Sequence, residues 1–221
     1  MNNLYRDFVI MYLAKLKQNK DTTLSKTLSK FNERQKEAAI INIYKYIVTD
    51  ILQISPYEAA KSIDMDTFKK LQFDKFLEFV NFPAGLPDEY KAAYLTHRAF
   101  PKVGFNTDWI IEVYLKALYS NKKITSKFFN DDLGEKKAYL CFLAAIKEFL
   151  PDLSQRELYE YFADKTNADN FIKNAMLSLA CRNKFGDDPL LYLHYALGEQ
   201  QNIILYEAYA YMNNYNSKIN S

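Results

Sequence analysis

An ordered internal repeat constrains this chain more than any other feature of its sequence. The residues at 7–20, DFVIMYLAKLKQNK, match those at 108–122, DWIIEVYLKALYSNK, so that Tyr12 falls on Tyr114. A repeat of this length is the sequence pattern of a duplicated structural unit, in which each copy folds in the same way. The pattern therefore predicts one module built twice, and any fold for the first copy must also suit the second.

The match continues in the same order after a loop that is shorter in the second copy. The phrase ISPYE at 54–58 meets LSQRE at 153–157, and both phrases have the form apolar-Ser-x-x-Glu. We therefore predict a tandem duplication of a helical module of roughly 100 residues. The first copy is expected at 1–101 and the second at 102–199.

The end of the chain resembles the start of the second copy. Residues 202–214, NIILYEAYAYMNN, match WIIEVYLKALYSN at 109–121. Repeat arrays need a terminal element that covers the last apolar face. We therefore predict a C-terminal capping helix and tail at 200–221, with the helix over about 200–214. The side chains expected to be buried by this cap are Ile203, Ile204 and Tyr211.

Apolar residues recur at helical spacing in both copies, and no Asn-Gly or Asp-Gly turn joins alternating β-branched runs. The expected fold class is therefore all-α, with five helices in each module. In the first copy the predicted helices lie at about 4–19, at 33–52, from 55 onward, at 66–81 with a break near Gln72, and at 88–99.

The start of the third helix carries a recognisable cap. Ser55 suits the N-cap position, Pro56 suits the first helical position, and Glu58 completes a capping box. Ser154 and Glu157 repeat the arrangement in the second copy. This local chemistry predicts where the helix begins in both copies.

Charge is concentrated at one end of a chain whose formal net charge is only +2. Residues 1–36 hold eight basic and three acidic side chains. A basic region of this kind can contact phosphates, or it can be a solvated loop that keeps an apolar chain soluble. The candidate nucleic-acid-binding residues are Lys15, Lys17, Lys20, Lys26, Lys30, Arg34, Lys36, Lys69 and Lys70.

The segment 55–80 suggests a helix-turn-helix, because a capped short helix is followed by a turn around Asp64 and a second helical stretch. Lys69 and Lys70 would then lie near the start of the second helix. The acidic residues in the segment oppose this reading, since they would face a phosphate backbone. Helical pairs are also common in all-α proteins, so simple packing is the alternative interpretation.

Residues that carry enzyme chemistry are sparse and scattered. The two histidines, His97 and His194, and the two cysteines, Cys141 and Cys181, lack the close spacing that a metal site needs. The glycines form no phosphate-binding loop. We therefore expect no catalytic residue, metal or cofactor and no enzymatic activity, although catalytic carboxylates leave no local motif and an enzyme that uses them stays open.

The sequence also indicates where in the cell the protein is expected. The first 18 residues lack the basic region and cleavage site of a signal peptide, and no run of about 18 apolar residues occurs. The two cysteines lie in apolar, helix-like runs, which is typical of reduced, buried thiols. We therefore expect a cytoplasmic protein without a membrane partner.

The pattern of a long helix, an (I/L)-S-x-x-E phrase and a closing segment such as NKFGDDPLLYLHYAL resembles an uncharacterised helical repeat family of Firmicutes. The phrase SPYEA at 55–59 is similar to one that members of this family carry. The resemblance implies a helical repeat, and it implies no activity for named residues.

The favoured function is that of a non-enzymatic binding or regulatory protein whose helical surfaces contact another macromolecule. A protein partner or self-association is expected, with no small-molecule cofactor. The alternative is a nucleic-acid-binding transcriptional regulator that uses the basic N-terminal region or the helix pair at 55–80.

Overall fold

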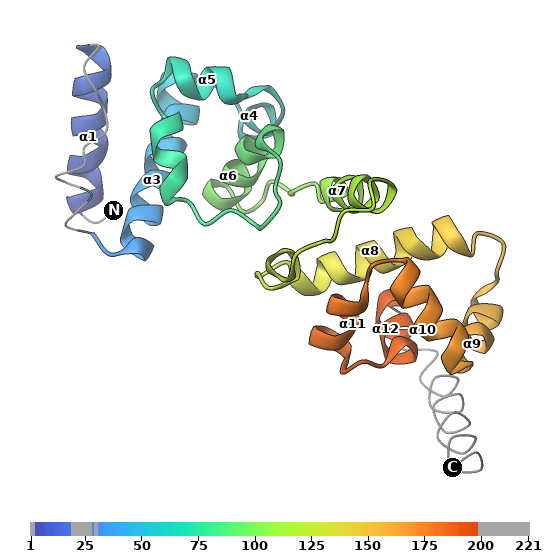
Figure 1. Cartoon of the computed structure of the whole chain (residues 1–221). Helices are drawn as coiled ribbons and strands as arrows, with labels where there is room; N and C mark the ends of the chain where they lie inside the picture. The colour runs from blue at the N-terminus through green and yellow to red at the C-terminus, as the bar shows by residue number, and fades with distance from the viewer. Residues whose placement is uncertain (1–2, 19–27, 29–30, 199–221) are drawn as a thin grey trace. The chain divides into compact units, whose positions relative to one another are not determined.

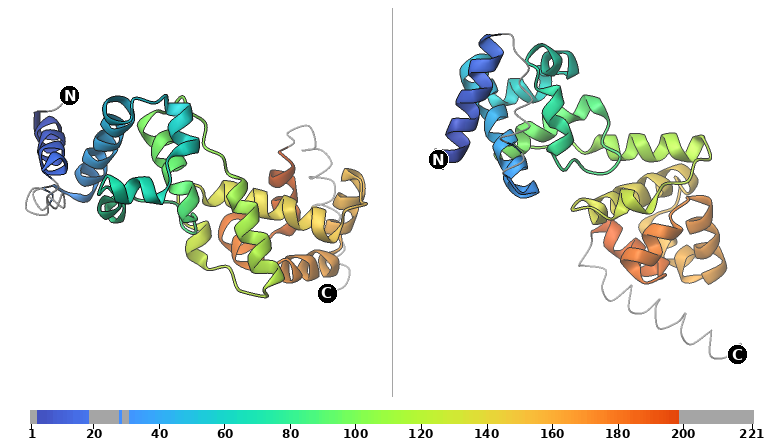
Figure 2. Two further views of the ribbon diagram at one scale, coloured as in Figure 1. Left: turned by 90° about the horizontal axis from the view of Figure 1, so that it is seen from above. Right: turned by 60° about the vertical axis from the view of Figure 1, so that its left-hand side comes forward.

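The computed structural model describes residues 3–18, 28 and 31–198, and every regular element in these residues is a helix (Figures 1 and 2). The predicted all-α class is therefore confirmed for this part of the chain. The capping helix and tail predicted at 200–221 lie outside the described residues. None of the helices described is long and apolar enough to cross a membrane.

The chain divides into two compact units, and no single cut in the sequence separates them. Unit 1 comprises Met1–Phe82 and Leu86–Thr107, and unit 2 comprises Pro83–Gly85 and Asp108–Ser221. Unit 2 therefore includes a three-residue segment from within the sequence of unit 1.

Unit 1 is built from helices that lie largely within the segments predicted from the sequence. Its elements are α1 (Asn3–Lys17), α3 (Glu33–Tyr46), the π-helical η1 (Ile47–Ile51), α4 (Pro56–Ser62), α5 (Met65–Lys70), the 3-10 helices η2 (Asp74–Phe79) and η3 (Asp88–Tyr90), and α6 (Lys91–Ala99). The helix predicted at 33–52 is α3 continued by η1. The segment predicted at 66–81 breaks at Gln72, whose φ of 52° ends α5 and separates it from η2.

The core of unit 1 is an aromatic cluster that ties its helices together. Tyr12 of α1 and Tyr44 of α3 are fully buried and contact the rings of Phe76, Phe68 and Phe73. Aromatic side chains of this size bury large apolar areas and favour the edge-on and tilted contacts seen here. The abundant Phe and Tyr of this unit are therefore used in packing.

Unit 2 is also built from helices in the residues that the structure describes. Its elements are α7 (Asp108–Tyr119), the 3-10 helix η4 (Ser126–Phe129), α8 (Gly134–Phe149), α9 (Gln155–Ala163), α10 (Lys165–Asn174), α11 (Ser178–Phe185) and α12 (Pro189–Leu197). The central helix α8 packs along α12 (Figures 1 and 2). The chain breaks between α10 and α11 at Met176, which has a φ of 57°. The described residues of unit 2 therefore hold six α-helices, one more than the five predicted for the module.

Helix starts follow the predicted local chemistry. Ser55 Oγ accepts a hydrogen bond from the Glu58 N–H at 3.1 Å. At Ser154 both halves of the capping box form, because the Glu157 carboxylate also accepts from the Ser154 N–H at 2.8 Å. Asp188 caps α12 by accepting from two backbone N–H groups, which is the structural role that an acidic residue before a proline indicates.

Candidate functional site

Part of the predicted basic set lies on two neighbouring elements of unit 1, α1 and α5. Lys15 and Lys17 lie in the last turn of this helix, and Lys17 is exposed. The Tyr12 hydroxyl donates to the Leu71 carbonyl at 2.6 Å, so the end of α5 lies beside the second half of α1. Lys69 and Lys70 at that end are exposed. Two basic pairs distant in sequence therefore lie on neighbouring elements.

The other basic residues do not join this group. Phe31, just before α3, packs on Phe8 with ring centroids 5.9 Å apart, so α3 begins beside the first half of α1. Lys17 lies nine residues farther along, about 14 Å at the rise of an α-helix. Arg34 is exposed at the start of α3, whereas Lys36 bonds Glu33 at 2.6 Å and lies over the Phe79 ring. Lys20, Lys26 and Lys30 lie outside the described residues.

The helix pair at 55–80 differs from a DNA-reading element. The second helix, α5, has six residues. Asp64 caps it, and hydrogen bonds from Thr67 lower the pKa of this carboxyl. Asp66 in the first turn pairs with Lys69 at 3.2 Å. Negative charge therefore lies at the end that a recognition helix presents to the bases.

Both histidines hold structural hydrogen bonds within their own units. His97 Nδ1 lies 2.7 Å from the Val103 carbonyl, and His194 Nδ1 lies 3.2 Å from the Tyr159 hydroxyl. Each is half-buried, His97 on α6 and His194 on α12. These hydrogen bonds give both histidines a structural role in holding neighbouring segments together.

The cysteines are buried thiols. Burial raises the pKa of Cys141, and burial with nearby carboxylates raises the pKa of Cys181 to about 12. The thiolate form that attacks electrophiles or binds metals is therefore disfavoured at neutral pH. In the described part of the chain, no group of three or more His, Cys, Asp or Glu side chains could hold a metal ion.

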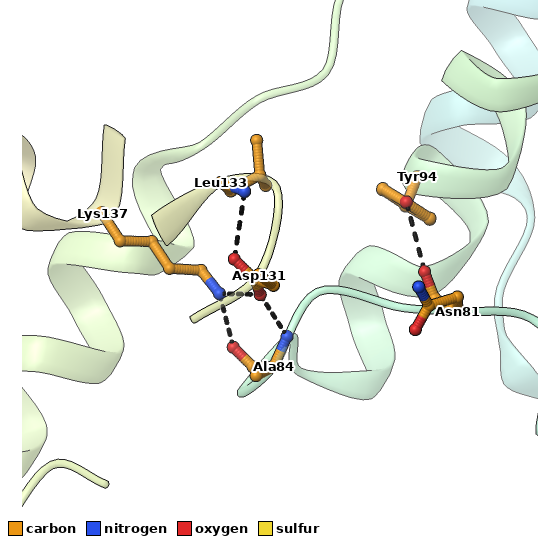
Figure 3. Close-up of polar contacts among 6 residues, drawn as sticks. All are labelled: Asn81, Ala84, Tyr94, Asp131, Leu133 and Lys137. Atoms are coloured by element: carbon orange, nitrogen blue, oxygen red, sulfur yellow. Dashed lines mark hydrogen bonds and ion pairs between the residues drawn. The ribbon is translucent and has the colours of Figure 1, made fainter. Parts of the chain in front are cut away.

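A buried lysine that the sequence reading missed lies at the centre of a polar cluster in unit 2 (Figure 3). Lys137 of α8 has a side chain with no exposed surface. Its Nζ donates to the Ala84 carbonyl at 2.9 Å and to Asp131 Oδ2 at 2.5 Å. Asp131 also accepts from the Ala84 N–H at 2.7 Å and from the Leu133 N–H at 3.0 Å. The cluster therefore fixes the 83–85 segment within unit 2.

Aromatic rings complete the surroundings of this ammonium group. Lys137 Nζ lies 4.6 Å from the centroid of the Phe128 ring and 5.3 Å from that of Trp109. The faces of such rings attract a cation. Burial is nevertheless the largest influence and lowers the pKa of Lys137, although Asp131 opposes it. Gly85 adopts a φ of 80° against Phe128, where an added Cβ would lie only 2.8 Å from the ring.

One sequence signal could have identified Lys137. The buried stripe of α8 includes Ala138, Cys141, Phe142 and Ala145, and Lys137 precedes Cys141 by four residues on the same face. A lysine in an apolar stripe must find a buried anion or acceptor. Its partner Ala84, however, lies 53 residues away and carries no distinguishing side chain.

Exposed apolar side chains form a stripe on the outer face of α1. Ile10 and Met11 are 52% and 40% exposed, and Ala14 is exposed one turn later. The opposite face supplies Phe8 and Tyr12 to the core. We call Ile10, Met11 and Ala14 the α1 outer stripe. Neighbouring exposed apolar residues on one helix face are a feature of binding surfaces.

A second exposed apolar group lies on unit 2, where α8 meets α12. Tyr139 and Tyr195 stack with parallel rings, their centroids 6.5 Å apart and their planes 5° apart. Tyr195 is 51% exposed and Leu143, one turn after Tyr139, is 36% exposed. We call these three residues the α8/α12 rim.

Comparisons of this chain with protein-family models, curated proteins and solved structures returned no match. The resemblance to a Firmicutes helical repeat family therefore stays a prediction.

Proposed function

We propose that this chain is a non-enzymatic binding protein that holds an amphipathic helix of a partner protein on the α1 outer stripe. The observation that carries the proposal is the exposure of Ile10 and Met11 on a helix whose other face is fully used in the core. Apolar anchors at this spacing suit helix-on-helix docking. Met11 adds an adaptable contact surface.

The experiment compares partner capture by three forms of the tagged chain. The double variant Ile10→Asp, Met11→Asp removes the apolar stripe and is expected to reduce recovery of the specific partner by about tenfold or more. Tyr57→Asp on α4 is the matched control, because Tyr57 is 63% exposed and lies outside the stripe. Equal capture by all three forms would reject the stripe as the docking site.

The proposal includes the tandem duplication, which several repeated details support. The residues buried along α3 and η1 include Ala39, Ile40, Ile43, Tyr44 and Ile47, and those buried along α8 at the same spacing include Lys137, Ala138, Cys141, Phe142 and Ala145. Tyr114 donates to the Ala175 carbonyl at 2.9 Å, as Tyr12 does to Leu71. In both units the accepting residue comes directly before the left-handed residue.

If the units are copies, the hydroxyls of Tyr12 and Tyr114 stabilise their units in the same way. Tyr12→Phe and Tyr114→Phe should each reduce the free energy of unfolding by about 1 kcal/mol, since each removes one buried hydrogen bond. Chemical denaturation of the two variants measures the losses. A clear loss for one variant and none for the other would contradict equivalent roles.

Nucleic-acid binding is the second candidate, and the proximity of the α1 and α5 ends favours it. Phosphate contacts from Lys15, Lys17, Lys69 and Lys70 would make affinity fall steeply with salt. A fluorescence-anisotropy titration with duplex and single-stranded DNA tests this. Lys17→Glu with Lys70→Glu should flatten the salt dependence, whereas Lys173→Glu on unit 2 should not. Absence of binding at low salt would remove this candidate.

A further inference from the structure

The α8/α12 rim is more apolar than the corresponding surface of unit 1. Three of the four buried positions of α6 and three of the four of α12 share one spacing: Leu95, Thr96 and Ala99 in the first, and Tyr192, Leu193 and Ala196 in the second. Aligned in this way, Arg98 takes the place of Tyr195. The alignment of α3 with α8 places Lys45 where Leu143 lies.

In unit 1 these positions suit contact with water. Arg98 pairs with Glu37 at 3.1 Å, and Lys45 lies with its ammonium over the Phe100 ring. In unit 2 the same positions carry Tyr195 and Leu143, which expose apolar surface. Exposing such surface is unfavourable unless another element covers it. The difference between the units therefore points to a cover on unit 2.

Unit 1 also shows how chain that follows the last helix can cover it. After α6 the chain turns back, and the Val103 carbonyl lies 2.7 Å from His97 Nδ1. Phe105 stacks on His97 with planes 24° apart and contacts the Tyr94 ring edge-on. The residues that follow α6 thus pack on the exposed side of that same helix.

The chain that follows α12 is suited to the equivalent position. Gly198 ends α12 in the left-handed conformation, with a φ of 66°, and its N–H donates to the Tyr195 carbonyl. The 23 residues after Gly198 include the apolar run IILY at 203–206. Ile203 follows Gly198, the C-cap of α12, by five residues, which span up to about 17 Å of extended chain. The run can therefore reach the rim.

We propose that the segment 199–221 binds in cis to the α8/α12 rim, with Ile203 and Ile204 packed against Leu143 and Tyr195. The contact completes the apolar surface of unit 2. This contact uses residues separate from the α1 outer stripe, so its test does not depend on the partner-binding proposal.

Hydrogen exchange on the full chain tests the contact. The variant Leu143→Lys, Tyr195→Arg gives the rim the side chains that unit 1 has at these positions. Protection of amides at 200–214 should fall by about tenfold in this variant and stay unchanged in the control Tyr57→Arg. Amides at 137–145 report whether unit 2 stays folded. Equal exchange of 200–214 in the wild type and the rim variant would overturn the proposal.

A second measurement approaches the contact from the tail. Ile203→Asp with Ile204→Asp should increase nitration of Tyr195 by tetranitromethane, because the ring loses its cover. Tyr57, on unit 1, is the internal reference for reagent access. An unchanged yield at Tyr195 would overturn the proposal. Protection of Tyr195 from nitration that disappears when the protein is diluted would also overturn the proposal, since the cover would then come from a second copy of the chain.

Discussion

Lys137 is the residue whose replacement has the clearest expected consequence. Lys137→Met keeps the length of the side chain but removes the ammonium that joins Asp131 to the Ala84 carbonyl. Asp131 stays about one-fifth exposed, so water compensates part of its lost partner. We expect the free energy of unfolding to fall by about 2 kcal/mol.

Trp109 reports this change directly. It is the single tryptophan of the sequence and lies 5.3 Å from Lys137 Nζ. Its emission should therefore shift in Lys137→Met at neutral pH, in the folded state. Lys147→Met, at an exposed position on the same helix, is the control and should leave the emission as it is. An unaltered spectrum in Lys137→Met would contradict the observed cluster.

The buried hydroxyl of Tyr44 should make the free energy of unfolding depend on pH in the alkaline range. Burial raises the pKa of its hydroxyl from 10.0 to about 12, so the folded chain holds this proton longer than the unfolded chain. The stabilisation is complete below pH 10 and is lost as the pH rises from 10 to 12. The expected loss is about 1.4 kcal/mol per pH unit over this window.

Urea unfolding at successive pH values separates Tyr44 from the other buried tyrosines. Tyr12, Tyr114 and Tyr192 also have raised pKa values, so the wild type loses stability through several groups of the same sign. The difference between the wild type and Tyr44→Phe isolates one group. This difference should shrink above pH 10. A difference that stays constant to pH 12 would show that the Tyr44 pKa is not raised.

At the scale of the helix, the two related caps should respond differently to the same substitution. The Glu157 carboxylate accepts from the Ser154 N–H and Oγ, whereas at Ser55 the bond observed is the one from the Glu58 N–H to the serine hydroxyl. Glu157→Ala should therefore lower the melting temperature, and Glu58→Ala should lower it by less. Thermal denaturation of both variants checks the order. Equal losses would argue against a special role for the reciprocal bond.

These caps also indicate which parts of the fold can be predicted from sequence. Ser154 and Glu157 are three residues apart, so the bond between them is local and follows from residue type. A break near Gln72 was also predicted, although the left-handed backbone there is not specific to glutamine. Contacts between distant segments are different, because the partner of Tyr12 is a backbone carbonyl 59 residues away.

The candidate surfaces were predictable to a smaller extent. The basic residues were found by composition, yet composition could not tell that Lys36 and Lys69 pair with Glu33 and Asp66. The rim was not predicted, because Tyr139 and Tyr195 meet only when α8 and α12 pack. Side-chain type suggests chemistry, but packing decides which groups stay available.

At the scale of the whole molecule, the discontinuous composition of unit 2 has a testable consequence. Pro83–Gly85 belongs to unit 2, although unit 1 surrounds it in sequence. A fragment of residues 108–221 would lack the Ala84 carbonyl and the backbone that packs on Phe128. We expect this fragment to melt several degrees lower than the same fragment with residues 80–86 fused to its N-terminus through a flexible Gly/Ser linker.

Trp109 emission distinguishes restored contacts from a general effect of added chain. In the fused fragment the emission should approach that of the intact protein, and in the bare fragment it should differ from it, because the Ala84 carbonyl no longer binds the Lys137 ammonium beside Trp109. The matched control carries Gly85→Val in the fused segment. A β-branched residue is disfavoured at a φ of 80° and would also collide with Phe128, so this fusion should restore neither stability nor emission. Identical emission from all three fragments would mean that Ala84 contributes nothing to the surroundings of Lys137.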